Sequence, residues 1–210
     1  MSSARPRPYV SETRALGAQA TRDRVLKAAR VLFVRHGIDG VTIAQIAARA
    51  EVAGSTVYAL YKSKEGLLRE LMRAALFGSR FAAARTQLDG VGDPVELIRL
   101  TPRVARAIYE GESAELGLIR GASAYSPALR RLEQEFENLR YEMQAARVRA
   151  LFAQKRQAQG LALDEARRIL WMYTGRDVYR MLVQEGGWTA DRYESWLGAT
   201  LVAALVAPSR

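Results

Sequence analysis

Apolar residues follow helical spacing through almost the whole chain, and this restricts the fold more than any other feature. Every periodic segment repeats its apolar residues at intervals of three and four, and none alternates apolar and polar residues as a strand does. After Pro127 this stripe consists of Leu129, Leu132, Phe136, Leu139, Met143, Ala146 and Ala150. The sequence therefore predicts an all-α protein of about nine helices.

Capping and helix-breaking residues divide this pattern into separate helices. Thr21 and Gly37 bound the first expected helix, and a capping box from Thr42 to Gln45 opens the second. Because proline lacks a backbone N–H, Pro102 is expected to kink or split its helix. Further helices are expected to begin near Ala53, Ser63, Asp93, Ser113, Ser126, Asp164 and Thr189, the one from Asp164 running to about Glu185.

The first 18 residues contain prolines and arginines but no apolar period. This composition is typical of a disordered basic arm, which we expect over residues 1–18. The remainder is expected to form a helical domain over residues 19–68 and a larger one over residues 69–210. The arm's arginines are candidates to enter a minor groove of DNA: Arg5, Arg7 and Arg14.

The composition removes most kinds of catalytic and metal site. The 210 residues include no cysteine and one histidine, which excludes disulfides, thiolate zinc sites and cysteine nucleophiles. That histidine, His36, precedes Gly37 at a helix end, where an imidazole can cap the last carbonyl groups. The sequence also has no glycine-rich phosphate loop. We therefore expect no enzyme, no catalytic residue, no metal and no cofactor.

Neither a membrane segment nor a secretory signal is indicated. The longest weakly polar run, Leu197 to Ala207, is about half the roughly 20 residues that a spanning helix needs. The N-terminal arginines have no apolar region behind them, unlike those of a signal peptide. These features favour a cytoplasmic protein that does not contact a membrane.

Positive charge is concentrated toward the N-terminus. The chain carries a formal charge of +10, and residues 1–70 hold 12 of its 32 basic residues but only 6 of its 22 acidic ones. A dense positive field attracts polyanions such as nucleic acid. The N-terminal third is therefore the candidate region for DNA binding.

Two short helices joined by a tight turn are expected behind a longer helix between Thr21 and Tyr61. This arrangement can place the end of its second short helix in the major groove of DNA. Small or polar residues at that end can reach base edges: Ala53, Gly54, Ser55 and Thr56. On spacing alone, a compact three-helix part of an α-bundle remains the alternative.

The residues between Thr21 and Leu71 resemble the DNA-binding domain of TetR-family transcriptional regulators. The resemblance rests on the run from Thr42 to Ala47, TIAQIA, and on the run from Val52 to Leu68, VAGSTVYALYKSKEGLL. It implies a dimer that binds operator DNA through its N-terminal domain. It also implies a C-terminal helical domain that binds a small ligand, which releases the DNA.

The resemblance assigns DNA contacts to Thr42, Gln45, Ser55, Thr56, Tyr58 and Lys64. Thr42 either binds phosphate or only caps its helix, and Lys64 is expected to bind phosphate. Tyr61 takes the place of a buried phenylalanine of the family. The chain departs from the family pattern at Glu51, Ala53, Ala59 and Leu60. We therefore expect few direct hydrogen bonds to bases and a larger role for apolar contacts or DNA shape.

The C-terminal part offers candidate ligand and dimer residues. Aromatic residues and arginines that could line a pocket are Tyr109, Arg120, Tyr125, Trp171 and Arg176, although aromatics at helical spacing are more often core. Apolar stripes on the last two expected helices predict a dimer interface of Ile169, Tyr173, Trp196, Leu197, Thr200 and Leu201.

The predicted function is a homodimeric repressor that binds a palindromic operator and is released by a small-molecule effector. The alternative is a ligand-binding protein of the same fold that activates transcription or has lost operator binding. Weak polar character at the expected recognition helix is the support for that alternative.

Overall fold

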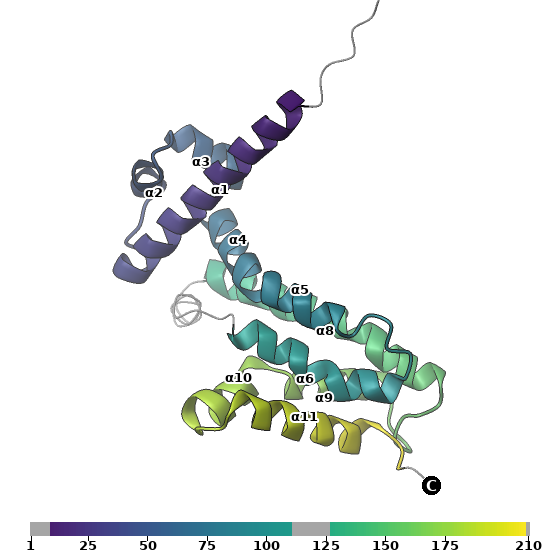
Figure 1. Cartoon of the computed structure of the whole chain (residues 1–210). Coiled ribbons are helices and arrows are strands. Elements are labelled where there is room, and N and C mark those ends of the chain that lie inside the picture. Colours follow the sequence, from purple (N-terminus) through teal and green to yellow (C-terminus); the bar gives the residue numbers. More distant parts are fainter. Residues whose placement is uncertain (1–8, 111–126, 209–210) are drawn as a thin grey trace, which may run out of the picture. The chain divides into compact units, whose positions relative to one another are not determined.

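The computed structural model describes residues 9–110 and 127–208, and the regular elements in these ranges are helical (Figure 1). They are ten α-helices and one short π-helix, and the β pairing within the same ranges is limited to an isolated bridge between Gln157 and Val206. The expected all-α fold is confirmed. The helix expected from Ser113 lies outside the described residues.

The chain divides into two compact units. One contains residues 1–73 and 114–129, and the other contains residues 74–113 and 130–210. The division after Arg73 falls within α4 (Lys64–Leu76).

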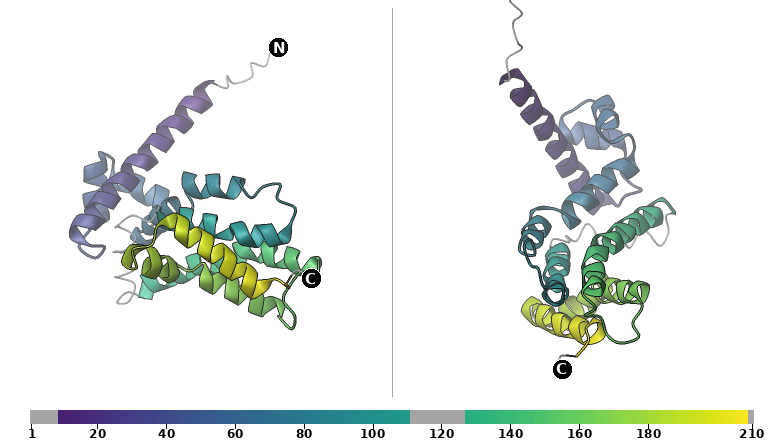
Figure 2. Two further views of the ribbon diagram at one scale, coloured as in Figure 1. Left: turned by 60° about the horizontal axis from the view of Figure 1, so that its bottom comes forward. Right: turned by 90° about the vertical axis from the view of Figure 1, so that its right-hand side faces the viewer.

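The first unit is organised around the long helix α1 (Tyr9–His36). Helix α2 (Ile43–Ala50) packs against α1, and α3 (Gly54–Tyr61) packs against α2. Both short helices lie on the same side of α1 (Figures 1 and 2). Their shared core includes Val25, Ala29, Ile46, Val57 and Leu67, whose side chains are fully hidden from solvent.

Local signals set most of the helix ends in this unit, as the sequence predicted. Gly37 follows α1 with a positive φ of 70°, and its N–H donates to the carbonyl oxygen of Phe33 at 2.9 Å. Thr42 caps α2, and Glu51 ends it in the left-handed conformation with φ 54°. Residues 51–53 are then enough to connect α2 to α3.

The start of α1 differs from the prediction. The helix begins at Tyr9 and not at Thr21, so residues 9–18 are helical where a disordered arm was expected. Thr21 does not cap the helix; its hydroxyl donates to the carbonyl oxygen of Gly17, one turn earlier in the same helix, at 2.9 Å. Residues 14–20 are exposed, so packing within the chain does not explain this extension. Alanine, leucine, arginine and glutamine favour helix without tertiary contacts, and they dominate the segment.

In the second unit, α6 (Pro94–Glu110) packs against α5 (Ser79–Thr86) and against α11 (Ala190–Leu205) (Figure 1). The remaining elements are α8 (Pro127–Ala153), α9 (Leu163–Tyr173), α10 (Arg176–Tyr179) and the π-helix η1 (Arg180–Glu185). The fully buried core residues of this unit include Ile98, Leu151, Leu170, Tyr193, Leu197, Leu201 and Leu205.

The segment from 163 to 185 is three elements and not the single helix that was predicted. Ala162, not Asp164, is the N-cap of α9, and α9 ends at Tyr173. The break falls at Thr174 and Gly175, where the backbone of Gly175 turns to φ −70°, ψ 155°. A Cβ on Gly175 would lie 2.9 Å from the carbonyl oxygen of Met172, so the close turn favours a glycine.

The buried face of α8 also differs from the predicted stripe. Leu129, Leu132 and Phe136 are buried as expected, but Leu139 is 45% exposed and Ala146 is exposed. Beyond Phe136 the inner face instead carries Arg140, Gln144, Val148 and Leu151. Two polar residues face inward there because the break at Thr174 offers them hydrogen-bonding partners.

Side-chain caps mark the start of two further helices. Asp93 accepts a hydrogen bond from the backbone N–H of Val95 at 3.0 Å at the start of α6, and Thr189 accepts one from Arg192 at 3.2 Å at the start of α11. Both caps agree with the sequence. Pro102 does not split α6, which is continuous through it. Helix α5, which follows Gly78, was not predicted because its eight residues show little apolar period.

Candidate nucleic-acid interface

Helix α3 has one face in the core and one face in solvent. Val57 and Tyr61 point inward, and the hydroxyl of Tyr61 donates to the carbonyl oxygen of Arg22 in α1 at 3.3 Å. Ser55 is exposed, and Tyr58 is 55% exposed although it is a large aromatic residue. Thr56 is half-buried. The expected core role of Tyr61 is thus confirmed, and the outward face of α3 presents a hydroxyl and a phenol ring.

Thr42 and Gln45 contact each other at the start of α2. The hydroxyl of Thr42 accepts from the backbone N–H of Gln45 at 3.2 Å, and the Gln45 side-chain oxygen accepts from the backbone N–H of Thr42 at 2.8 Å. The same oxygen lies 3.1 Å from the Thr42 hydroxyl, which donates to it. The predicted capping box is therefore complete. Both residues are exposed.

Lys64, the first residue of α4, holds the connection between α1 and α2. Its ammonium group donates to the carbonyl oxygens of Ile38 at 2.9 Å and Val41 at 3.3 Å. These bonds offset the unfavourable position of a cation at a helix N-terminus. An ammonium group has three N–H donors, so one remains for another acceptor. The sequence indicated a cation here but not the carbonyl groups that it binds.

Glu65 and Ser63 complete the start of α4. The Ser63 hydroxyl accepts from the backbone N–H of Gly66 at 3.1 Å. Hydrogen bonds from its own backbone N–H and from Ser63, together with the charge of Lys64, lower the pKa of Glu65. The turn between α3 and α4 is therefore fixed by short-range polar contacts, which in turn hold the end of α3.

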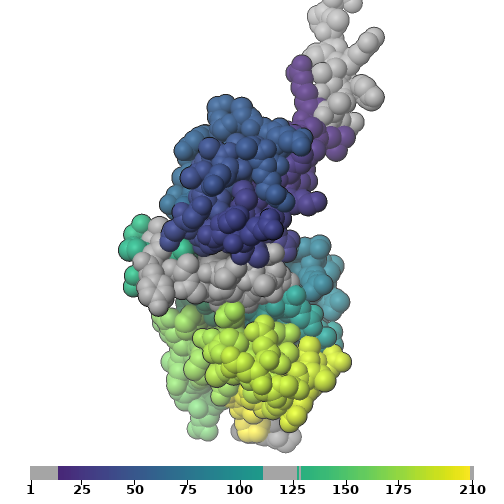
Figure 3. All heavy atoms as spheres, turned by 90° about the vertical axis from the view of Figure 1, so that its left-hand side faces the viewer, coloured from purple at the N-terminus to yellow at the C-terminus, as the bar shows by residue number. Residues whose placement is uncertain are grey.

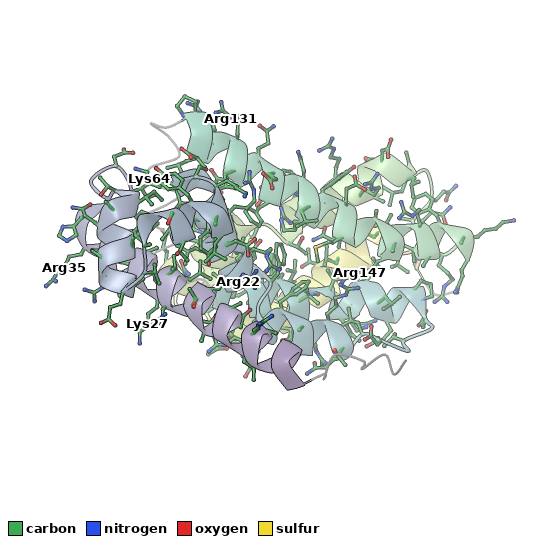
Figure 4. The ribbon with its side chains drawn as sticks, turned by 90° about the horizontal axis from the view of Figure 1, so that it is seen from above. Arg22, Lys27, Arg35, Lys64, Arg131 and Arg147 are labelled. Carbon is green, nitrogen blue, oxygen red and sulfur yellow. The ribbon has the colours of Figure 1, made fainter. Side chains whose placement is uncertain are left out.

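The first unit also carries cations that the sequence analysis did not single out. Arg24 and Lys27 of α1 and Arg49 of α2 line an open groove between these helices. All three are exposed, and Figure 4 shows Lys27 on the outer side of α1. Their spacing of three residues on α1 was a readable signal for a charged helix face. Helix α3 itself has no charged residue, so the positive field of this unit comes from other elements, including α1 and α2.

Three of the predicted ligand residues lie in the described part of the second unit, and each has its own neighbours. Tyr109 is buried, its hydroxyl donates to the carbonyl oxygen of Thr174 at 2.9 Å, and its ring packs 5.6 Å from that of Tyr179. Trp171 lies under the guanidinium of Arg140, 5.1 Å from the ring centre. Arg176 is half-buried at the start of α10. The other two predicted ligand residues, Arg120 and Tyr125, lie outside the described residues.

A narrow cavity does exist in the second unit, with different walls. It lies between α5, α6 and α8, and Tyr109, Trp171 and Arg176 do not line it. Its lining is Phe77, Phe81, Thr101, Val104, Ala105, Ile108, Arg140, Met143, Gln144, Arg147 and Thr174. Its volume of about 20 Å³ admits a water molecule, so an organic ligand requires the walls to move apart.

The predicted dimer residues fall into two groups. Leu197 and Leu201 have no exposed surface, because they belong to the face of α11 that packs inside the unit. That part of the predicted interface is corrected: these two side chains are core. Ile169, Tyr173, Trp196 and Thr200 are half-buried and remain candidates. In Figure 3 the C-terminal helices form an outer face of the second unit.

A close approach between helices explains why that face of α11 points inward. A Cβ on Gly198 would lie 2.8 Å from the carbonyl oxygen of Arg99 in α6. The two backbones therefore pass too close for a larger residue. The apolar stripe of α11 could equally have been assigned to a partner chain from sequence, because periodicity does not identify which neighbour covers a face.

Among the described residues, no group of three His, Asp or Glu side chains is placed to hold a metal ion. None of the described helices has the length and apolar character needed to cross a membrane. His36 is exposed in the last turn of α1.

Comparison with known proteins identifies relatives of the first unit and of the fold. Residues 25–71 match the family described as bacterial regulatory proteins, tetR family. No curated protein matches the chain. The fold is similar to a putative TetR-family transcriptional regulator from Rhodococcus sp., with 19% identity, 89% of this chain and 99% of that chain covered, and a TM-score of 0.63.

Two similar structures contain a small molecule. A putative transcriptional regulator from Saccharomonospora viridis in complex with choline is 21% identical, with 90% and 98% of the two chains covered and a TM-score of 0.63. FadR from Bacillus subtilis in complex with stearoyl-CoA is 16% identical, with 86% and 97% covered and a TM-score of 0.64. At these identities the similarity establishes the fold alone.

Proposed function

This chain has the fold of a TetR-family transcriptional regulator and carries that family's N-terminal domain over residues 25–71, and from this premise we propose that it is a repressor that binds operator DNA. The observation that carries the proposal is the outward face of α3. Tyr58 is 55% exposed on an eight-residue helix whose other face is anchored by Val57 and Tyr61. A half-apolar aromatic ring held in solvent on a rigid helix is suited to contact a thymine methyl group or a sugar-phosphate backbone.

Electrostatics support the same surface. Residues 1–70 hold 12 basic and 6 acidic residues, and the exposed cations of α1 and α2 add to the field around α3. We assign phosphate contacts to Thr42, Gln45 and Lys64 and contacts in the groove to Ser55, Thr56 and Tyr58. Lys64 would donate to a phosphate through the third N–H of its ammonium group, which is not bonded to the carbonyl oxygens of Ile38 and Val41. DNA binding of this kind weakens steeply with salt.

Dimerisation and effector release complete the proposal. A dimer through the half-buried outer residues of α9 and α11 would present two copies of α3 to a palindromic operator. An effector in the cavity between α5, α6 and α8 would have to separate these helices, since the cavity of about 20 Å³ is too small for it. The complexes of similar proteins with choline and with stearoyl-CoA support an effector site in this fold. We place this activity in the cytoplasm, where bacterial DNA is accessible.

A second candidate function is a protein of the same fold that activates transcription or no longer reads an operator. One observation favours it. Helix α3 begins at Ala53 without a side-chain cap, and Ala59 is exposed where a polar group would contact DNA. The two candidates differ in whether DNA is bound and in what an effector does to the complex.

Replacing Tyr58 by alanine is expected to weaken DNA binding by about tenfold or more, because a stacking or methyl contact of this kind contributes roughly 1–3 kcal/mol. The measurement is a gel-shift titration with the intergenic DNA beside the gene. The exposed position of the ring predicts an unchanged thermal midpoint. Leu139→Ala, which removes a similarly exposed side chain from α8, is the matched control and should leave DNA affinity unchanged.

The outcomes separate the two candidates. Equal affinity of Tyr58→Ala and the unchanged chain would remove α3 from the interface. No retardation of any genomic fragment would favour the protein that has lost operator binding. Retarded DNA that is released by a metabolite fraction supports the repressor.

Lys64→Met should separate the two roles of this lysine. Methionine keeps the apolar stem but loses the hydrogen bonds to Ile38 and Val41, so we expect the free energy of unfolding to fall by about 1 kcal/mol. If the remaining N–H binds phosphate, the slope of log affinity against log salt also decreases by about one. Lys155→Met, an exposed lysine in the second unit, is the charge-matched control. A stability loss without a change in slope would restrict Lys64 to holding the α1–α2 connection.

A further inference from the structure

Two arginines on the same face of α8 line the cavity of the second unit, and within residues 9–110 and 127–208 only one of them has partners. Arg140 donates to Glu137 at 2.6 Å, to the carbonyl oxygen of Trp171 at 2.8 Å and to the hydroxyl of Thr174 at 3.0 Å. Its charge and its donors are therefore satisfied. Arg147, two turns later, also lines the cavity. Residues seven apart on a helix share a face, so both guanidinium groups belong to the same wall.

Arg147 has no counter-ion in the described part of the chain. Among the described residues, no carboxylate forms an ion pair with it and no acceptor receives a hydrogen bond from it, although the side chain is half-buried. It extends from α8 toward α5 (Figure 4). Burial lowers the pKa of Arg147, and the like charge of Arg85, an exposed residue of α5, lowers it further. Desolvating a cation costs free energy, and no described residue offsets that cost with an opposite charge or an acceptor.

Gln144 provides a second unsatisfied group in the same wall. Its amide nitrogen donates to the hydroxyl of Thr174 at 2.8 Å, and that hydroxyl donates in turn to the carbonyl oxygen of Leu170 at 2.7 Å. Because the Thr174 hydrogen is used in this way, the amide orientation is fixed and the Gln144 oxygen points elsewhere. That oxygen is buried and has no hydrogen-bond donor, while the residue is only 8% exposed. A buried acceptor without a donor is uncommon and costly.

Most of the remaining lining is apolar. It consists of Phe77, Phe81, Val104, Ala105, Ile108 and Met143, with Thr101 as a further polar residue. A molecule that fills the cavity therefore meets hydrocarbon over most of its surface, together with a cation and an acceptor. This is the usual composition of a ligand site, with a few polar groups that fix orientation.

We propose that the second unit binds an organic anion, with a carboxylate, phosphate or sulfonate held by Arg147 and an apolar body among the aromatic and aliphatic residues of the cavity. An O–H or N–H near the anionic group would satisfy the oxygen of Gln144. The inference rests on the proposed function, because we take this anion to be the effector, and it narrows the effector to one chemical class. A bound anion would neutralise the half-buried charge of Arg147, and this favours the open, ligand-filled arrangement over the closed one.

The test uses two fluorescent probes that share an aromatic skeleton and differ in charge. 1-Anilinonaphthalene-8-sulfonate carries the anionic group, and N-phenyl-1-naphthylamine lacks it. With the full chain, Arg147→Met is expected to weaken binding of the sulfonate by about tenfold or more, since a charge-assisted contact in a half-buried site is lost. Binding of the neutral probe should change by less than about twofold, because methionine preserves the apolar wall. Arg147→Lys should retain part of the sulfonate affinity.

Three controls keep the result specific. Arg149→Met removes an exposed arginine from the same helix and should alter neither probe. Ala105→Leu fills the cavity and should weaken both probes, which places them there. Thermal unfolding of Arg147→Met should occur at the same or a higher temperature, because an unpaired, partly desolvated charge is removed. A lower midpoint would instead assign Arg147 a structural role.

Three results would overturn the proposal. Arg147→Met could leave sulfonate binding intact, or it could weaken binding of both probes equally. The third is that the wild-type protein does not bind the sulfonate more tightly than the neutral probe. A gel shift on the same samples reports operator binding separately. If the unchanged chain binds DNA but gives any of these probe results, the anion site alone is refuted. If it binds no DNA but Arg147→Met selectively weakens binding of the sulfonate, the repressor function alone is refuted.

Discussion

Leu201→Ala is expected to lower the free energy of unfolding by about 3–5 kcal/mol, and it should do so without changing the oligomeric mass. The side chain has no exposed surface and lies on the face of α11 that packs within its own unit. Truncation removes buried hydrocarbon and leaves a cavity that a closely approached helix pair cannot close. Urea denaturation followed by circular dichroism measures the first effect, and light scattering measures the second.

The neighbouring residue provides the matched control. Thr200 is half-buried, and its hydroxyl donates to the carbonyl oxygen of Trp196 in the same helix at 2.9 Å. Thr200→Ala is expected to change stability by less than about 1 kcal/mol. If Leu201→Ala instead left stability within that range and dissociated a dimer, Leu201 would belong to a subunit interface as the sequence first indicated.

Helix positions followed from the sequence wherever a short-range signal determined them. The capping box of Thr42 and Gln45, the glycine after α1 and the cap at Thr189 each depend on residues within four positions of one another. Such signals are complete within the sequence. They were sufficient for the helix order of the first unit and for the placing of Ser55 and Tyr58 on an outward face.

Predictions failed where a distant partner decides the outcome. Periodicity assigned Leu139 to the core of α8, but Arg140 and Gln144 turn inward because Thr174 and the carbonyl of Trp171 lie opposite. The helix break at Thr174 is itself needed to make the Thr174 hydroxyl and the Trp171 carbonyl available. The sequence of α8 alone does not indicate that Arg140 and Gln144 are buried, and the sequence around Thr174 alone does not indicate the break, because each feature is unfavourable without the other.

The functional residues also fall into those that short-range sequence signals identify and those that depend on distant partners. Lys64 was identified as a cation of the interface, yet its bonds to Ile38 and Val41 depend on a loop 23 or more residues earlier. Arg147 was not identified, because nothing in the sequence distinguishes an arginine that has a carboxylate partner from one that lacks it. The cavity wall is defined by three helices at once, and the aromatics chosen from spacing, Tyr109 and Trp171, face other neighbours.

Gly198→Leu is expected to be the most damaging substitution considered, with a loss of about 4 kcal/mol or more in the free energy of unfolding. A Cβ at this position would already lie 2.8 Å from the backbone oxygen of Arg99, and backbone cannot move aside as a flexible side chain can. Separating α6 from α11 would also loosen the core around Leu201 and Tyr193, which are fully buried there.

A graded series distinguishes this close approach from a general effect of losing glycine. Gly198→Ala should destabilise less than the leucine variant, since the gain in helix propensity of about 1 kcal/mol offsets part of the strain. Gly17→Ala is the control: nothing lies within 4 Å of its Cβ position in the middle of α1, so the same exchange should leave stability unchanged or raise it by up to about 1 kcal/mol. Urea denaturation of all three variants provides the measurement. Equal effects of alanine at positions 17 and 198 would show that α6 and α11 do not approach as closely as described, and with that the inward assignment of Leu197 and Leu201 would lose its structural reason.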